Sequence, residues 1–282
     1  MTALAAAERA APVFRPGRVL QSLRTAEPGF FGCAVALLFA ATPLAFAAGI
    51  EARTFLGINV WIKPLKFELA LIVYLLTLAL FARWLPTGTT GRRWYRAYRL
   101  AVIAAIVAEM VWIGGAAMLG TASHFNRTPT GIVIYSAMGL GAILLTTPTA
   151  VYAWLIARNP ATGLAPALKS SVVIGLGLVL PLTLATAGTM SSLATHAVGG
   201  AGTDAGGLPL MGWARDGGDL RVAHFFATHA LHFIPAFGLV SAAFFGSANR
   251  LPVRIFATIY AGFVIWVFAE ALAGRPFLPW IG

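Results

Sequence analysis

Long apolar stretches dominate this chain and constrain its fold more than any other feature. Seven can be drawn, each close to the roughly 20 residues that a helix needs to cross a bilayer core about 30 Å thick. They cover residues 30–50, 64–84, 99–120, 131–156, 171–190, 222–247 and 253–273. Only 10% of the 282 residues are charged, against about 25% in soluble domains. The sequence therefore predicts an all-α integral membrane protein, a bundle of seven transmembrane helices.

The connections predict a simple domain organisation. Residues 1–28 form a basic segment without the apolar core of a signal peptide, so we expect the first apolar stretch to stay as an anchor. Residues 29–282 are predicted to form a single transmembrane domain. Its longest connection, residues 191–221, is rich in glycine and is not expected to form a strand-rich domain.

The basic residues indicate the orientation. The net charge is +11, and Lys and Arg accumulate in the cytoplasmic connections of membrane proteins. With the N-terminus in the cytoplasm and the C-terminus outside, dense and sparse basic segments alternate, and no nucleic-acid partner is needed to explain the charge. The cytoplasmic segments then contain Arg9, Arg15, Arg18, Arg24, Arg83, Arg92, Arg93, Arg96, Arg99, Arg158, Lys169, Arg250 and Arg254. The other side contains Arg53, Lys63, Lys66, Arg127, Arg215, Arg221 and Arg275.

Several residues bear on helix packing. Prolines inside the apolar stretches remove a backbone donor, and a kink there can open a cavity; alternatively, neighbouring helices and waters satisfy the freed carbonyls. These are Pro43, Pro148, Pro181 and Pro235. Pairs of glycines are expected to let helices approach closely, namely Gly114 and Gly115, Gly139 and Gly141, and Gly175 and Gly177. Cys33 is the only cysteine, which excludes an intrachain disulfide.

The histidines gather on one side of the membrane. On this topology all of them lie outside or in its outer half, and they are His124, His196, His224, His229 and His232. His229 and His232 are about 60° apart around one helix, and His224 shares their broad stripe. Because imidazole is both a metal ligand and a near-neutral base, these three predict a metal site, an axial haem ligand or a proton relay. The alternative is hydrogen bonding to neighbouring helices.

Glu109 lies near the centre of stretch 99–120, where a lone carboxylate must be protonated or paired. His232 is expected at a comparable depth, so one hypothesis is a pair between Glu109 and His232. Glu109, His229 and His232 are the candidate catalytic residues on this interpretation. The alternative is a neutral Glu109 bonded to a backbone carbonyl for helix packing.

Two lysines stand at the start of the second apolar stretch. Pro64 suits the first turn of a helix, which places Lys63 and Lys66 on one face. They are expected to attract an anionic ligand or headgroup, or to pair with a carboxylate; the alternative is snorkelling to the interface. The candidate carboxylates are Glu68, Glu109 and Glu270. The candidate cofactor-binding residues are Lys63, Lys66, His124 and His224.

Two polar connections border the same side. His124 and Arg127 are expected to cap the cavity that the lysines line. Asp219 is predicted to cap the helix of stretch 222–247, with Arg215 or Arg221 paired to Asp216.

Three short strings resemble an uncharacterised family of bacterial multi-pass membrane proteins. They are WIKPLKF at 61–67, SHFN at 123–126 and GDLRVAHF at 218–225. The resemblance covers the second to sixth apolar stretches and implies the inner membrane of a bacterium as the location. It implies no activity, so no catalytic role is taken from it.

Three functions stay open at this point. The first is a site facing outward that binds a metal or haem for redox or hydrolytic chemistry. The second is a proton-coupled transporter, in which Glu109 and His232 exchange protons while Lys63, Lys66 and Arg127 attract an anion. The third is a receptor or accessory subunit whose polar cluster locks the helices. The last stretch contains no lysine, which argues against a retinal protein, and phosphate-binding loops, nucleophile elbows and zinc-protease helices are not found in the sequence.

Overall fold

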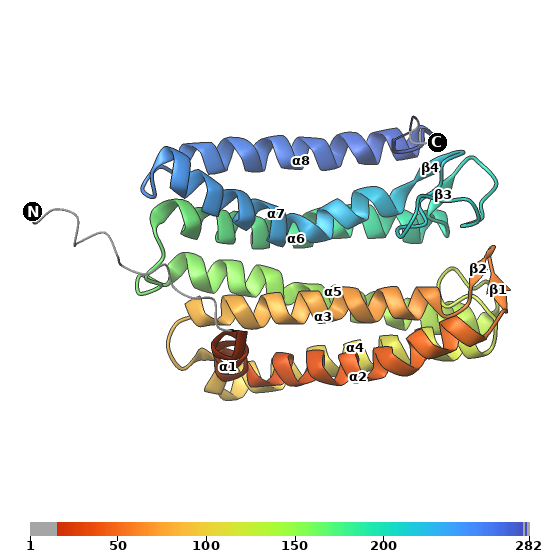
Figure 1. Cartoon of the computed structure of the whole chain (residues 1–282), viewed down its shortest axis with the longest axis horizontal. Coiled ribbons are helices and arrows are strands. Elements are labelled where there is room, and N and C mark those ends of the chain that lie inside the picture. Colours follow the sequence, from red (N-terminus) through yellow and green to blue (C-terminus); the bar gives the residue numbers. More distant parts are fainter. Residues whose placement is uncertain (1–15, 279, 281–282) are drawn as a thin grey trace, which may run out of the picture.

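Seven long helices run side by side along the longest axis of the molecule (Figure 1). The computed structural model describes residues 16–278 and residue 280, so Arg9 and Arg15 lie outside the described part. Each of the seven is long and apolar enough to cross a membrane, which confirms the predicted all-α, seven-span fold. They are α2 (Pro28–Ile50), α3 (Ile62–Phe81), α4 (Arg93–Met118), α5 (Pro129–Arg158), α6 (Pro166–Leu193), α7 (Leu220–Phe245) and α8 (Leu251–Leu272).

All seven helices begin before the apolar stretches that predicted them. The largest difference is at α4, which begins at Arg93 rather than at residue 99 and carries Arg93, Arg96 and Arg99 in its first two turns. Hydropathy detects only the apolar part of a helix, whereas the backbone stays helical into the interface, where long basic side chains reach water. The basic N-terminal segment also contains a helix that the sequence did not predict, α1 (Pro16–Ala26).

The remaining elements are short. They are the 3₁₀ turns η1 (Ala82–Trp84) and η2 (Thr89–Gly91) and the strands β1 (Thr54–Phe55), β2 (Ile58–Asn59), β3 (Ala197–Val198) and β4 (Gly218–Asp219). β1 pairs with β2 and β3 with β4, both antiparallel. The connection 191–221 therefore contains only two-residue strands, as expected.

The two ends of the bundle differ. Residues 51–61, 119–128, 194–219 and 273–278 form one end, called here the loop end, where all four strands lie (Figure 1). The opposite end, called the α1 end, carries α1 and the shorter connections 85–92, 159–165 and 246–250. Because the number of spans is odd, the described N- and C-terminal residues lie at opposite ends.

Close packing of α6 against α7 depends on glycine. A Cβ atom at Gly175 would lie 2.9 Å from both the carbonyl oxygen of Ala230 and Cδ of Pro235. At Gly238 a Cβ would collide with the side chain of Ser171. The predicted role of Gly175 is therefore confirmed. At Gly114, Gly115 and Gly139 a Cβ would meet nothing within 4 Å, so the predicted close approach at these three is wrong.

The apolar side chains divide between the bundle core and its outer surface. Leu75, Ile106 and Ile234 come from three helices and are fully buried in one hydrophobic cluster. Phe39 and Phe244 point outward and are 75% and 79% exposed. Long helices with an apolar exterior require a lipid environment.

Candidate functional site

The Gly-rich connection 194–219 folds over the loop end and is hydrogen-bonded to the β1–β2 turn and to α3. The hydroxyl of Thr203 and the backbone N–H of Asp204 both donate to the carbonyl of Leu56, at 2.7 and 2.9 Å. Lys66 Nζ of α3 donates to the carbonyl of Met211 at 3.0 Å. Gly212 has a φ of 68°, a backbone conformation that favours glycine. It packs closely against Lys66, because a Cβ atom added at Gly212 would lie only 3.3 Å from Lys66 Nζ. The connection therefore forms a lid over the first turns of α3 and α7.

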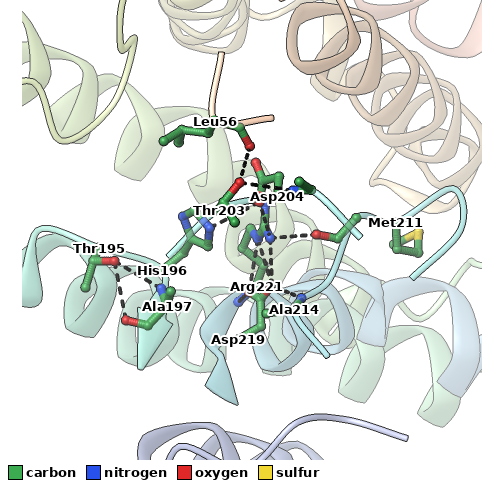
Figure 2. Close-up of polar contacts among 12 residues, drawn as sticks. Leu56, Thr195, His196, Ala197, Thr203, Asp204, Met211, Ala214, Asp219 and Arg221 are labelled. Carbon is green, nitrogen blue, oxygen red and sulfur yellow. Dashed lines mark hydrogen bonds and ion pairs between the residues drawn. The ribbon is translucent and has the colours of Figure 1, made fainter. Parts of the chain in front are cut away.

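Arg221, in the first turn of α7, organises this lid (Figure 2). Its guanidinium lies 2.7 Å from Asp219 Oδ2 and 2.7 Å from Asp204 Oδ1, and it donates to the carbonyl of Gly212 at 2.8 Å. Asp219 caps α7 by accepting from the backbone N–H of Arg221 at 3.0 Å, which confirms the predicted cap. The predicted pairing of Asp216 is wrong: Arg221 pairs with Asp219 and Asp204, and Asp216 accepts from the backbone N–H of Ala201.

Asp204 is ionised by its surroundings. Burial raises the pKa of its carboxyl, but contact with His196 at 3.4 Å and the charge of Arg221 outweigh burial and lower the pKa to about 2. Figure 2 shows the imidazole of His196 and the guanidinium of Arg221 on two sides of this carboxylate. The lid is thus held to α7 by an ion pair.

Lys63 and Lys66 lie under the lid, both in the first turns of α3 as predicted. Lys63 lies within electrostatic reach of Asp204 and Arg221. Lys66 is satisfied by the carbonyl of Met211, whereas the part-buried ammonium of Lys63 has no hydrogen bond to another residue in the described chain. The three cations Lys63, Lys66 and Arg221 face two carboxylates, which leaves an excess positive charge beneath the lid.

His124 lies beside Lys63 at the loop end. Its ring packs 5.6 Å from that of Phe67 and 5.8 Å from that of Tyr135 between centroids. Burial, followed by the nearby charges of Lys63 and His224, lowers the pKa of His124 to about 3. His124 is therefore neutral at physiological pH, and it supplies a polar but uncharged wall.

The α7 histidines have defined tautomers. The hydroxyl of Thr186 donates to the carbonyl of Leu182, so it accepts from His224 Nδ1 at 3.2 Å. His229 Nδ1 donates to the carbonyl of Phe225 at 2.8 Å, because a carbonyl only accepts. In both residues the second nitrogen, Nε2, therefore carries a free lone pair.

His232 has the opposite tautomer. The Thr77 hydroxyl has one proton, which it donates to the carbonyl of Val73 at 2.7 Å. Its oxygen must then accept from His232 Nε2 at 2.9 Å. The lone pair is left on His232 Nδ1, which is buried without a hydrogen-bond partner in the described chain.

These histidines bear on the predicted metal or haem site. The rings of His229 and His232 lie 5.2 Å apart between centroids, and each has one unprotonated nitrogen, so they could supply two ligands. Among residues 16–278 and 280, however, no three His, Cys, Asp or Glu side chains are grouped as a metal ion requires. His224 instead bonds to Thr186 on α6.

The predicted pair between Glu109 and His232 does not form. Glu109 is 7% exposed and faces α5, with Oε1 3.5 Å from a Cβ position at Gly141, whereas His232 bonds to Thr77 on α3. The rotation of α4 about its axis determines which helix Glu109 faces, and the spacing of residues in the sequence does not indicate that rotation. Glu109 Oε1 and Glu68 Oε2 are both buried without a hydrogen-bond partner in the described chain.

Two further predicted residues lie outside the site. Glu270 forms a surface ion pair with Arg275, at 2.6 Å between Oε2 and Nε, rather than a pair with a lysine of α3. Arg127 is exposed on the connection between α4 and α5. Neither lies beneath the lid.

Asp204 was missed in the sequence. It stands in the connection 194–219, which composition marked only as rich in glycine. The available signal was electrostatic: three cations at the starts of two helices require a counter-charge, and Asp204 is an acidic residue of the connection that crosses them.

No protein-family model matches the chain, and no curated protein or solved structure matches it either. Fold and site define the class on their own: this is a multi-pass membrane protein with a lidded, positively charged site at one end of its seven-helix bundle.

Proposed function

We propose that the chain binds a small anionic ligand, a carboxylate or a phosphate, beneath the lid at the loop end. The observation that carries the proposal is the excess positive charge of Lys63, Lys66 and Arg221 over Asp204 and Asp219. Lys63 is available to bind a ligand, because its part-buried ammonium has no hydrogen bond within the described chain. An anion within reach of this ammonium would accept a charge-assisted hydrogen bond from it.

The lid sets how the ligand enters. Lys66 and Arg221 bind the carbonyls of Met211 and Gly212, so both cations must release the lid before they can bind an anion. The many lysines and arginines of the α1 end support an orientation with that end in the cytoplasm. Placed in a bacterial inner membrane, the site then takes its ligand from the periplasm.

The test is anion binding to the purified full chain in lipid nanodiscs. Inorganic phosphate, sulfate and succinate are titrated, and heat and thermal shift are recorded. In Lys63→Met, loss of one charge-assisted hydrogen bond should weaken binding of the best anion about tenfold or more. Lys169→Met is the matched control, because Lys169 bonds to the carbonyl of Asn159 at the α1 end. The proposal fails if no anion binds, or if both variants weaken binding equally.

Proton-coupled transport is a second candidate, favoured by Glu68 and Glu109. Both carboxyl groups are buried, at 3% and 7% exposure, with an oxygen that has no partner in the described chain. Intramembrane carboxyl groups of this kind mark proton pathways. Uptake of the bound anion into proteoliposomes, driven by a pH gradient and abolished in Glu109→Gln, would support transport; binding without uptake would leave a receptor.

The metal or haem hypothesis rests on His229 and His232. Metal analysis and an optical spectrum of the purified protein, compared with a His229→Ala, His232→Ala variant, test it directly. A stoichiometric metal or a Soret band that disappears in the variant would establish the cofactor.

A further inference from the structure

A cavity lies far from the lid, toward the α1 end. It has a volume of about 450 Å³ and lies between the end of α3, the start of α6 and the second half of α7. Most of its wall is apolar, including Leu80, Phe81, Leu168, Val172 and Leu239. Leu239 is also 61% exposed on the outer surface of the bundle, so the cavity opens toward lipid. A molecule that fills it must therefore be largely apolar and must come from the membrane.

One charged group stands at this wall. Arg83 lines the cavity from the turn η1 and is exposed. Its guanidinium carbon lies 5.3 Å from the centre of the Trp84 ring, and its Nε donates to the carbonyl of Leu80 at 3.1 Å. These contacts hold the guanidinium beside the cavity. Its other two nitrogens have no hydrogen bond in the described chain, whereas the polar groups of Thr77 and His232 bond to each other.

The α1 end supplies no counter-charge for Arg83. Among the described residues, Glu27 is the only carboxylate at this end, and it pairs with Arg99 at 3.0 Å. Other cations stand at the same end, in the connections or at the helix ends beside them, and they include Arg92, Arg93, Arg158, Arg250 and Arg254. An anion that binds Arg83 must therefore come from outside the described chain.

An apolar cavity with an unpaired arginine at its wall fits a lipid that carries a net negative charge. The planar guanidinium of arginine matches a phosphate group, and basic pockets between transmembrane helices bind anionic headgroups. A free phosphate ion would leave the apolar wall uncovered, and a zwitterionic lipid would add its own cation to an end that is already rich in cations. We propose that the cavity holds an acyl chain of an anionic phospholipid, whose phosphate binds Arg83. This site is independent of the anion site under the lid.

The experiment compares two lipids with the same acyl chains. Native mass spectrometry of the full chain in detergent counts bound lipids during titration with dioleoyl phosphatidylglycerol or dioleoyl phosphatidylcholine. The first phosphatidylglycerol should bind about tenfold more tightly than the first phosphatidylcholine, the effect of one charge-assisted hydrogen bond. Equal affinity for the two lipids, or no saturable binding of either, would overturn the proposal.

A matched pair of arginine variants tests the role of Arg83. In Arg83→Gln the preference for phosphatidylglycerol should disappear. Arg158→Gln is the control, because Arg158 is also exposed at the α1 end and lies over a tryptophan, 4.5 Å from the centre of the Trp154 ring, but it does not line the cavity. This variant should keep the preference. An equal loss in both variants would mean that the total charge of this end attracts the lipid, which contradicts the proposed site.

A second pair of variants tests the place of the acyl chain. Ala236 lines the cavity and is exposed, so Ala236→Trp fills the space without entering the core, and it should weaken binding of the first phosphatidylglycerol about tenfold or more, a loss of at least about 1.4 kcal/mol. Ala185→Trp is the control, because Ala185 is exposed on α6 outside the cavity. Thermal unfolding shows that each variant is folded. Unchanged binding in a folded Ala236→Trp variant would show that the lipid does not occupy the cavity.

Discussion

At the scale of single residues, Arg221 is the group on which the lid most depends. Its guanidinium is the shared partner of Asp204 and Asp219, whose side chains are 11% and 0% exposed. Replacing it by Ala leaves two buried carboxylates without their cation. Breaking a buried pair from one side costs about 3 kcal/mol.

We therefore expect Arg221→Ala to destabilise the protein by about 3 kcal/mol and to open the lid. Chemical unfolding in detergent measures the loss of stability, and the rate of hydrogen exchange at residues 203–214 measures the opening of the lid. Arg275→Ala is the matched control, because its pair with Glu270 lies on the surface and should contribute little. Slow lid exchange in Arg221→Ala would show that the hydrogen bonds to Leu56 and from Lys66 hold the lid without Arg221.

His124 predicts a pH dependence of stability. Its pKa is about 3 in the folded protein, against an ordinary value of 6.5. Between these values the unfolded chain binds a proton that the folded chain does not, so stability falls as the pH is lowered from 6.5 toward 3. The slope for one proton is at most about 1.4 kcal/mol per pH unit. In His124→Gln the slope of stability against pH should be smaller. An unchanged slope would mean that other groups cause the pH dependence.

The sequence predicted these residues unevenly, for physical reasons. Lys63, Lys66 and the cap Asp219 follow from their positions at helix starts, and His124 follows from its place in the connection between two predicted spans, all of which local spacing indicates. The partner of Arg221 does not, because Asp204 reaches it only through the path of a glycine-rich lid. The tautomer of His232 depends on the single proton of Thr77, 155 residues away in the sequence.

At the scale of helices, the α6–α7 contact depends on the absence of a side chain at Gly175 as well as at Gly238. A Cβ at Gly175 would lie 2.9 Å from a backbone oxygen and from a proline ring, neither of which can rotate away. A Cβ at Gly177 would meet only Ala153, at 3.9 Å. The two glycines are two residues apart on the same helix, so they form a matched pair.

Gly175→Ala should therefore destabilise the protein by about 1–3 kcal/mol through overpacking. Gly177→Ala should be neutral or stabilise it by about 0.4–1 kcal/mol, because alanine restricts the unfolded chain. Unfolding by detergent titration measures both. Equal effects would mean that α6 and α7 can separate slightly without cost.

Helix positions were the most predictable part of the fold. Runs of apolar residues specify where a chain must satisfy its own backbone in lipid, so all seven spans follow from hydropathy. Rotation of each helix about its axis is another matter, since α2 and α5 are apolar on nearly every face. On α4, Glu109 is the only charged residue between Leu100 and Met118, so the sequence does not indicate which way this helix is rotated, and Glu109 faces Gly141 of α5 rather than His232.

At the scale of the whole molecule, orientation decides which compartment the lid faces. The distribution of basic residues predicts that the α1 end lies in the cytoplasm and the loop end on the other side of the membrane. Cys33 is the only cysteine, so Cys33→Ser gives a background without thiols. Thr87 and Arg127 are exposed in connections at opposite ends of the bundle, and each can carry a single new cysteine.

Arg127→Cys should react with a membrane-impermeant maleimide in intact spheroplasts, and Thr87→Cys only after the membrane is broken. This outcome would place the lid and its cations outside, where an anion from the periplasm reaches them. The opposite labelling would mean that the orientation in the membrane is reversed. The lid would then face the cytoplasm, and the anion site would bind cytoplasmic ligands. Labelling of both cysteines in intact spheroplasts would contradict a single orientation in the membrane.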